Sequence, residues 1–124
     1  MSKSILIIDD EELIVKSLLK LLGVQGYKAD VARSGKEALE KIKSADFDLL
    51  ICDVRMPDLD GVETIRQIRT YLAQSNKKPV PEILITGYAD ADKYEEAMAL
   101  KVADYLYKPF DNIQLLQAVK GVIG

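Results

Sequence analysis

The sequence predicts an α/β domain with a doubly wound, five-stranded parallel sheet and helices on both of its faces. Short apolar runs alternate along the chain with stretches in which apolar residues recur at helical spacing. The runs at 5–8 and 49–52 are apolar without interruption, which is typical of strands covered on both faces. The connections are short, and such units form right-handed crossovers between parallel strands. No linker is evident, so residues 1–124 are expected to form a single domain.

The composition excludes several classes of protein. No apolar run approaches the roughly 20 residues of a membrane helix, and no signal-peptide pattern opens the chain, so we expect a cytoplasmic protein without a membrane segment. The net charge of −3 argues against direct contact with nucleic acid. Histidine is absent, which removes catalytic arrangements such as Ser/His/Asp and the commonest zinc ligand. Cys52 is the single cysteine and is interpreted as a core residue.

The first strand is expected at 4–8, where an apolar run is closed by acidic residues. From residue 12 the spacing becomes helical, with acids in the first turn and a possible stop at Gly23. The apolar face of this helix comprises Ile14, Leu18, Leu21 and Leu22. Residues 27–32 alternate between apolar and polar, which indicates a strand at the sheet edge.

Ser34, with Glu37 three residues later, predicts a capping box for a second helix. The stretch 47–61 opens with the third strand, ends it on Asp53 and then breaks into a turn rich in proline, aspartate and glycine. A third helix follows Gly61. Its apolar face comprises Val62, Ile65, Ile68 and Leu72.

The polar segment 73–81 is expected to be a fairly long loop, and 82–85 a fourth strand with Thr86 at its end. A fourth helix is expected at 90–100, and residues 105–107 form the fifth strand before Lys108. The apolar side of the fourth helix comprises Ala91, Tyr94, Ala97 and Met98. The last helix is capped by Asp111, and its apolar face comprises Ile113, Leu116, Val119 and Ile123.

Polar residues stand at the carboxyl ends of four strands, and they are Asp9, Asp10, Asp53, Thr86 and Lys108. These ends meet at one edge of a parallel sheet, where open α/β folds bind their ligands. Two carboxylates about 4 Å apart repel by about 4 kcal/mol at an effective dielectric constant near 20. A site of oxygen ligands without histidine or thiolate suits a hard cation, so we expect Mg²⁺ as a cofactor. A metal, an ammonium and a hydroxyl beside a carboxylate also favour phosphoryl transfer onto Asp53.

In these residues the chain resembles the receiver domain of two-component response regulators, over essentially its whole length. The matching motifs are Asp9-Asp10, Asp53, the turn 56–61, Thr86-Gly87 and the segment 105–110. The resemblance implies a flavodoxin-like (βα)5 fold with strand order 2-1-3-4-5. It also implies a switch that accepts a phosphoryl group on Asp53 from a sensor histidine kinase or a phosphotransfer protein. Such a domain is not an enzyme beyond slow reactions of its own phosphoryl group.

The resemblance implies a role for each site residue. Asp10, Asp53 and the backbone carbonyl of Arg55 would ligate Mg²⁺ directly, and Asp9 would help through water. Lys108 and Thr86 would each contact a phosphoryl oxygen.

The resemblance also describes the output of the switch. Tyr105 would turn inward in response to Thr86 and repack the surface formed by the fourth helix, the fifth strand and the fifth helix. That surface would control an effector domain or a partner protein, and a homodimer on phosphorylation is possible. The bond between Lys108 and Pro109 would be cis.

Two alternative functions share features of this site. A hydrolase of the haloacid dehalogenase type requires a second acid two residues after Asp53, where this chain has Arg55. The other alternative is a receiver-like interaction module that does not depend on phosphate, and the presence of all five strand-end residues argues against it. Arg55 and Tyr88 occupy positions that the resemblance connects with phosphoryl lifetime. Lys101 stands where glycine is usual, so the turn before the fifth strand is expected to be built differently.

Overall fold

The protein, described for residues 2–124 by a computed structural model, forms one five-stranded parallel sheet in the order β2-β1-β3-β4-β5. The predicted sheet and strand order are therefore confirmed. The strands are β1 (Ser4–Ile8), β2 (Lys28–Ala32), β3 (Leu49–Asp53), β4 (Glu82–Thr86) and β5 (Asp104–Tyr107). The helices are α1 (Glu12–Val24), α2 (Gly35–Ser44), α3 (Gly61–Gln74), α4 (Ala91–Ala99) and α5 (Asn112–Ile123).

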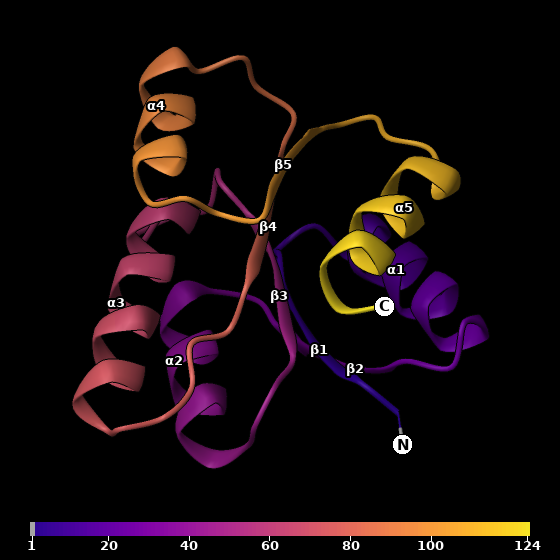
Figure 1. Cartoon of the computed structure of the whole chain (residues 1–124). Helices are drawn as coiled ribbons and strands as arrows, with labels where there is room; N and C mark the ends of the chain where they lie inside the picture. Colours follow the sequence, from indigo (N-terminus) through magenta and orange to yellow (C-terminus); the bar gives the residue numbers. More distant parts are fainter. Residues whose placement is uncertain (1) are drawn as a thin grey trace.

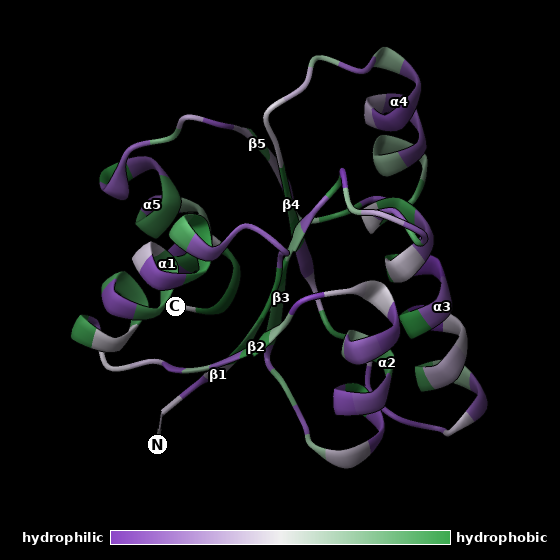
Figure 2. Cartoon of the chain, turned by 180° about the vertical axis from the view of Figure 1, so that it is seen from behind, coloured by the Kyte–Doolittle hydropathy of each residue, from purple (hydrophilic) through white to green (hydrophobic). Residues whose placement is uncertain are grey.

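Helices cover both faces of the sheet, with α1 and α5 on one side and α2, α3 and α4 on the other (Figure 1). Each face has its own apolar core. In β1, Ile5 and Ile7 belong to the core under α1 and α5, whereas Leu6 and Ile8 belong to the opposite core. Successive residues of a strand point to opposite faces, so a strand between two helical layers must be apolar at every position. Figure 2 shows the central strands in the colour of hydrophobic residues.

Side-chain caps begin most of the helices. The Ser34 hydroxyl accepts a hydrogen bond from the backbone N–H of Glu37 at 3.1 Å, as the capping box predicts. The carboxylate of Glu37, however, accepts the N–H of Arg33 at 3.3 Å rather than that of Ser34. Asp60, Asp90 and Asp111 cap α3, α4 and α5. These caps fix where each strand-end loop turns into a helix.

Two expectations about helix ends are wrong. The first helix does not stop at Gly23 but continues to Val24, and Gly26, with φ of 88°, provides the left-handed residue that ends it. Lys101 adopts φ of 56°, so the turn before β5 has the conformation that glycine favours, built with a lysine.

The expected apolar faces of the last two helices are partly exposed. Tyr94 and Met98 of α4 are 42% and 39% exposed, and Ile113 of α5 is 69% exposed. Ala97 is the residue of α4 that is fully buried. The helix is short and rests on the sheet through this small side chain, so its larger apolar groups stay in contact with solvent.

Candidate functional site

Three carboxylates converge at the carboxyl edge of the sheet. Asp9 follows β1 and Asp53 ends the adjacent strand β3, and one carboxylate oxygen from each of these two and from Asp10 lie within 4.8 Å of one another. Asp9 is 0% and Asp53 2% exposed, whereas Asp10 faces solvent. The structure therefore confirms that these three residues lie close together at one edge of the sheet.

The turn after β3 folds tightly against the strand end because of Gly61. Its N–H donates to the carbonyl of Val54 at 2.8 Å, and a Cβ at this position would lie 2.1 Å from the carbonyl oxygen of Asp53. Any side chain here would push α3 away from the site. The same turn directs the N–H of Arg55 to the Asp53 carboxylate at 3.3 Å.

Lys108 reaches the acidic cluster from the end of β5. Its Nζ lies 3.3 Å from a carboxylate oxygen of Asp9, 3.5 Å from one of Asp53 and 2.7 Å from one of Glu11. The backbone N–H of Lys108 donates to the carbonyl of Thr86 at 2.7 Å, and the peptide bond to Pro109 is cis, as expected. One ammonium is therefore shared among three carboxylates.

The charges in the cluster are out of balance. Burial, with the negative charge of Asp9 added to it, raises the pKa of Asp53 from 3.8 to about 7, although Lys108 opposes the shift. Burial also raises the pKa of Asp9. Burial alone would lower the pKa of Lys108, but its hydrogen bond to Glu11 and the charges of Asp53 and Asp9 raise it. The site favours a bound cation or a proton.

The cluster opens into a cleft of about 870 Å³ that is also lined by Arg55 and Tyr88. The guanidinium of Arg55 lies 4.6 Å from the centroid of the Tyr88 ring. It also lies 3.4 Å from the carboxylate of Asp90, the residue that caps α4. The cleft is thus lined by acidic side chains, by Lys108 and by this cation–aromatic pair.

The remaining predicted residues, Thr86 at the end of β4 and Tyr105 in β5, do not line this cleft. Thr86 is 1% exposed, and its hydroxyl accepts the N–H of Tyr88 at 3.2 Å. The ring of Tyr105 packs edge-on against Tyr94 and Tyr107, with centroids 5.2 and 5.4 Å apart. Among the buried side-chain atoms of residues 2–124, the hydroxyl of Tyr105 is the one without a hydrogen-bond partner.

Two contacts were missed from the sequence. Glu11 makes the shortest contact of Lys108, and Asp90 ties Arg55 to α4. Glu11 is two residues from Asp9 in the same loop, so its position near the site follows from the sequence. No local pattern indicates that its side chain, which is 57% exposed in the structure, pairs with Lys108. Asp90 lies 35 residues from Arg55, and no local pattern connects them.

The fold and the site together define a doubly wound α/β domain with a cluster of carboxylates at the carboxyl edge of its sheet. The chain belongs to the response regulator receiver domain family, whose sequence model matches residues 5–120. This family serves two-component signalling, as a phosphoacceptor domain rather than a conventional enzyme, and its members bind Mg²⁺ at an acidic pocket.

Named relatives agree with this membership. The chain is 38% identical over 113 residues to the transcriptional regulatory protein ZraR of Klebsiella oxytoca, covering 90% of this chain and 24% of that protein. It is 34% identical over 125 residues to the alkaline phosphatase synthesis transcriptional regulatory protein PhoP of Bacillus subtilis, covering 99% of this chain and 49% of PhoP. The chain thus spans about a quarter to a half of the length of these relatives.

Solved structures show the same fold. The chemotaxis protein CheY4 of Vibrio cholerae superposes with a TM-score of 0.88 at 32% identity, covering 98% of this chain and 99% of CheY4. A receiver domain protein from Methanospirillum hungatei gives 0.88 at 28% identity, covering 98% and 93%. None of the helices within residues 2–124 combines the length and apolar character needed to cross a membrane.

Proposed function

We propose that the domain is a phosphorylation-dependent switch in which Asp53 accepts a phosphoryl group from a partner histidine kinase or phosphotransfer protein. One observation carries this proposal. The carboxylate of Asp53 stands at the end of β3, within 4.8 Å of two further carboxylates and 3.5 Å from the ammonium of Lys108. Residues 1–124 contain no histidine, so a phosphohistidine donor lies outside this domain.

The transfer forms one bond and breaks one. A carboxylate oxygen of Asp53 bonds to phosphorus, while the bond from phosphorus to the donor's imidazole nitrogen breaks. That nitrogen keeps the electron pair of the broken bond and takes up a proton from solvent. Such transfers depend mainly on in-line positioning and on neutralising the phosphoryl oxygens. Lys108, held against the cluster by Glu11 and Asp9, would contact one of these oxygens.

The donor set fits Mg²⁺. It consists of oxygen ligands, carries an excess of negative charge and raises the pKa of Asp53, all of which favour a hard divalent cation. Asp10, Asp53 and the backbone carbonyl of Arg55 would hold the ion, and Asp9 would act through water. When bound, the ion would neutralise the carboxylates and the phosphoryl oxygens.

Thr86 and Tyr105 would connect phosphorylation to the output surface of α4, β5 and α5. In this structure the Thr86 hydroxyl oxygen accepts the N–H of Tyr88, and the O–H of the same group would donate to a phosphoryl oxygen, which is a charged acceptor. Burying a hydroxyl without a hydrogen-bond partner costs about 1–3 kcal/mol of stability. This cost would favour a different conformation of Tyr105 when space opens beside Thr86. This rearrangement would change the surface that an effector domain or a second copy of the chain contacts.

The proposal is tested by incubating the protein with acetyl phosphate and Mg²⁺ and measuring its intact mass. We expect a phosphoryl adduct that is labile to base and absent from the Asp53→Ala variant. Asp46→Ala, which removes an exposed carboxylate, is the matched control and should keep the adduct. Omission of Mg²⁺ should slow adduct formation strongly.

A wild-type protein that forms no adduct with acetyl phosphate or with any histidine kinase tested would contradict the proposal. That result would favour the phosphate-independent interaction module. An adduct that persists in Asp53→Ala would place the acceptor elsewhere and would equally contradict it.

A further inference from the structure

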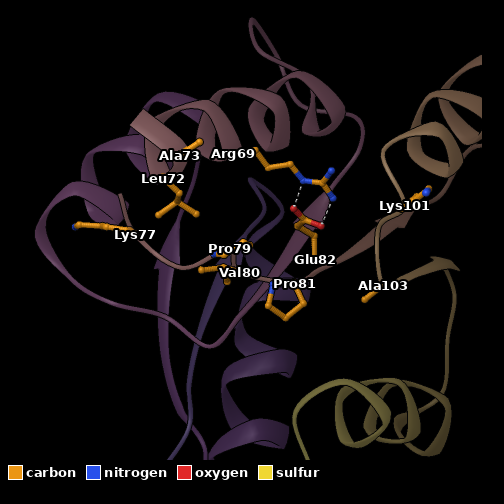
Figure 3. Close-up of a pocket in the computed structure, with 10 residues that line it drawn as sticks. All are labelled: Arg69, Leu72, Ala73, Lys77, Pro79, Val80, Pro81, Glu82, Lys101 and Ala103. Atoms are coloured by element: carbon orange, nitrogen blue, oxygen red, sulfur yellow. Dashed lines mark hydrogen bonds and ion pairs between the residues drawn. The ribbon is translucent and has the colours of Figure 1, made fainter. Parts of the chain in front are cut away.

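A second cavity lies at the amino edge of the sheet, opposite the edge that carries Asp53 (Figure 3). It opens beside Glu82, the first residue of β4, and has a volume of about 510 Å³, within the range of roughly 300–1,000 Å³ typical of small-ligand sites. We call it the β4 cavity. Its wall is largely apolar and is formed by Leu72, Ala73, Pro79, Val80, Pro81 and Ala103.

The anionic group of the β4 cavity is already neutralised. Glu82 is 2% exposed, and its two carboxylate oxygens accept hydrogen bonds from Arg69 at 2.7 and 2.8 Å. The remaining terminal nitrogen of Arg69 donates to the carbonyl of Leu100 at 2.5 Å. Figure 3 shows this paired geometry on one side of the cavity. All three guanidinium nitrogens of Arg69 therefore donate to protein acceptors, and its side chain forms part of the cavity wall.

Two further cations line the cavity. Lys77 and Lys101 stand at its opposite ends, with their side chains directed outward (Figure 3). Within residues 2–124 neither takes part in an ion pair. The ammonium of Lys77 lies 5.5 Å from the centroid of the Tyr71 ring. With Arg69 offset by Glu82, the lining keeps two positive charges, although the whole chain has a net charge of −3. This local excess favours an anion and disfavours a cation.

Backbone features indicate that the site is formed in advance. Pro79 and Pro81 restrict the loop that makes one wall, which lowers the entropy lost on binding. Lys101 has φ of 56°, a conformation that costs a residue with a side chain about 1 kcal/mol relative to glycine. Strained residues of this kind cluster at functional sites, and here the strain accompanies an ammonium at the rim of the cavity.

We propose that the β4 cavity binds a small amphipathic acid, a monocarboxylate with an aliphatic body. The body would pack against the apolar wall, and the side chain of Lys77 or Lys101 would turn toward the rim to contact the carboxylate. The largely apolar wall and only two uncompensated ammonium groups suit a single negative charge better than a polyphosphate. This binding is separate from phosphoryl transfer, because the cavity contains none of the residues proposed for that reaction.

The proposal is tested by backbone amide NMR of the intact chain titrated with octanoate, octylamine and octanol. We expect octanoate to cause saturable shifts confined to residues 69–82 and 100–103. Octanol should bind about tenfold more weakly because it lacks the charge, and octylamine should not bind. Equal affinity for octanoate and octylamine, shifts spread over the surface, or no saturation would overturn the proposal. Binding of acidic peptides without binding of octanoate would overturn it too.

Variants separate the wall from the rim. Ala73→Phe fills the cavity from an exposed helical position and should abolish octanoate binding, whereas Gln74→Phe, at the next exposed residue outside the lining, should retain it. Lys101→Gly keeps the left-handed turn while removing the ammonium, and together with Lys77→Gln it should weaken octanoate binding about tenfold without affecting octanol. Unchanged octanoate affinity in Ala73→Phe, or in the double variant, would refute the assignment.

Discussion

The Asp53→Asn variant should be more stable than the wild type when metal is removed. Burial and the charge of Asp9 raise the pKa of Asp53 from 3.8 to about 7. Each unit of pKa difference corresponds to about 1.4 kcal/mol, so ionised Asp53 destabilises the folded protein by at most about 4 kcal/mol. Solvent in the open cleft screens the charges and reduces this value, so we expect a gain of about 2 kcal/mol, or about 6 to 10 °C in Tm.

The gain should depend on pH in a defined direction. The folded-state pKa of Asp53 lies above its unfolded value, so the stability associated with its protonation is complete below pH ~4 and is lost as the pH rises through about 7. The wild type therefore becomes less stable between these limits through this group, whereas Asp53→Asn has no such contribution. The advantage of the variant should be small at pH 4.5 and full at pH 8.

Urea unfolding followed by circular dichroism, in EDTA at both pH values, measures this difference. Asp46→Asn removes an exposed carboxylate and should match the wild type. If Asp53→Asn is less stable than the wild type at pH 8, or shows the same advantage at both pH values, the electrostatic account of the site is incorrect.

Three further changes test other parts of the structure by urea unfolding. Gly61→Ala should cost about 2–3 kcal/mol, because the added methyl group would lie 2.1 Å from the backbone carbonyl oxygen at the end of β3. Gly23→Ala, with open space around it, should be neutral or stabilising. Equal effects of the two substitutions would refute this reasoning. Arg69→Met should cost about 3–5 kcal/mol by leaving the buried carboxylate of Glu82 unpaired. Most of this loss should be recovered when Glu82→Gln is added. A double variant as unstable as the single one would contradict the reasoning. Tyr105→Phe removes a buried hydroxyl without a partner and should leave stability unchanged or raise it by up to about 1 kcal/mol, so a clear loss would show that the hydroxyl is bonded.

The sequence predicted the sheet because its signals are local. Apolar runs closed by polar residues mark strands covered on both faces, and the order of elements then limits the topology. The convergence of Asp9, Asp53 and Lys108 followed from that topology, since parallel strands end at one edge. The same reasoning located Thr86 beside them.

What the sequence did not predict depends on contacts between distant segments. The pairing of Glu11 with Lys108 spans 97 residues, and that of Arg55 with Asp90 spans 35. Helical spacing placed Tyr94 on an apolar side but could not show that α4 rests on the sheet through Ala97. The β4 cavity likewise depends on how the loop after α3 meets the turn after α4.

The alternation of side chains along β3 limits which insertions and deletions this chain can accept in evolution. Side chains alternate between faces, and Asp53 pairs in register with Ile85. Inserting or deleting one residue within β3 would exchange the two cores and move the carboxylate away from Lys108, so fold and site would be lost together. A change in the length of the loop 75–81 at the amino edge would alter the β4 cavity, but it would leave the alternation of side chains in every strand intact and would cost little stability. Sequence variation within this chain can therefore accumulate at the edge that carries the β4 cavity, while strand lengths at the other edge stay fixed.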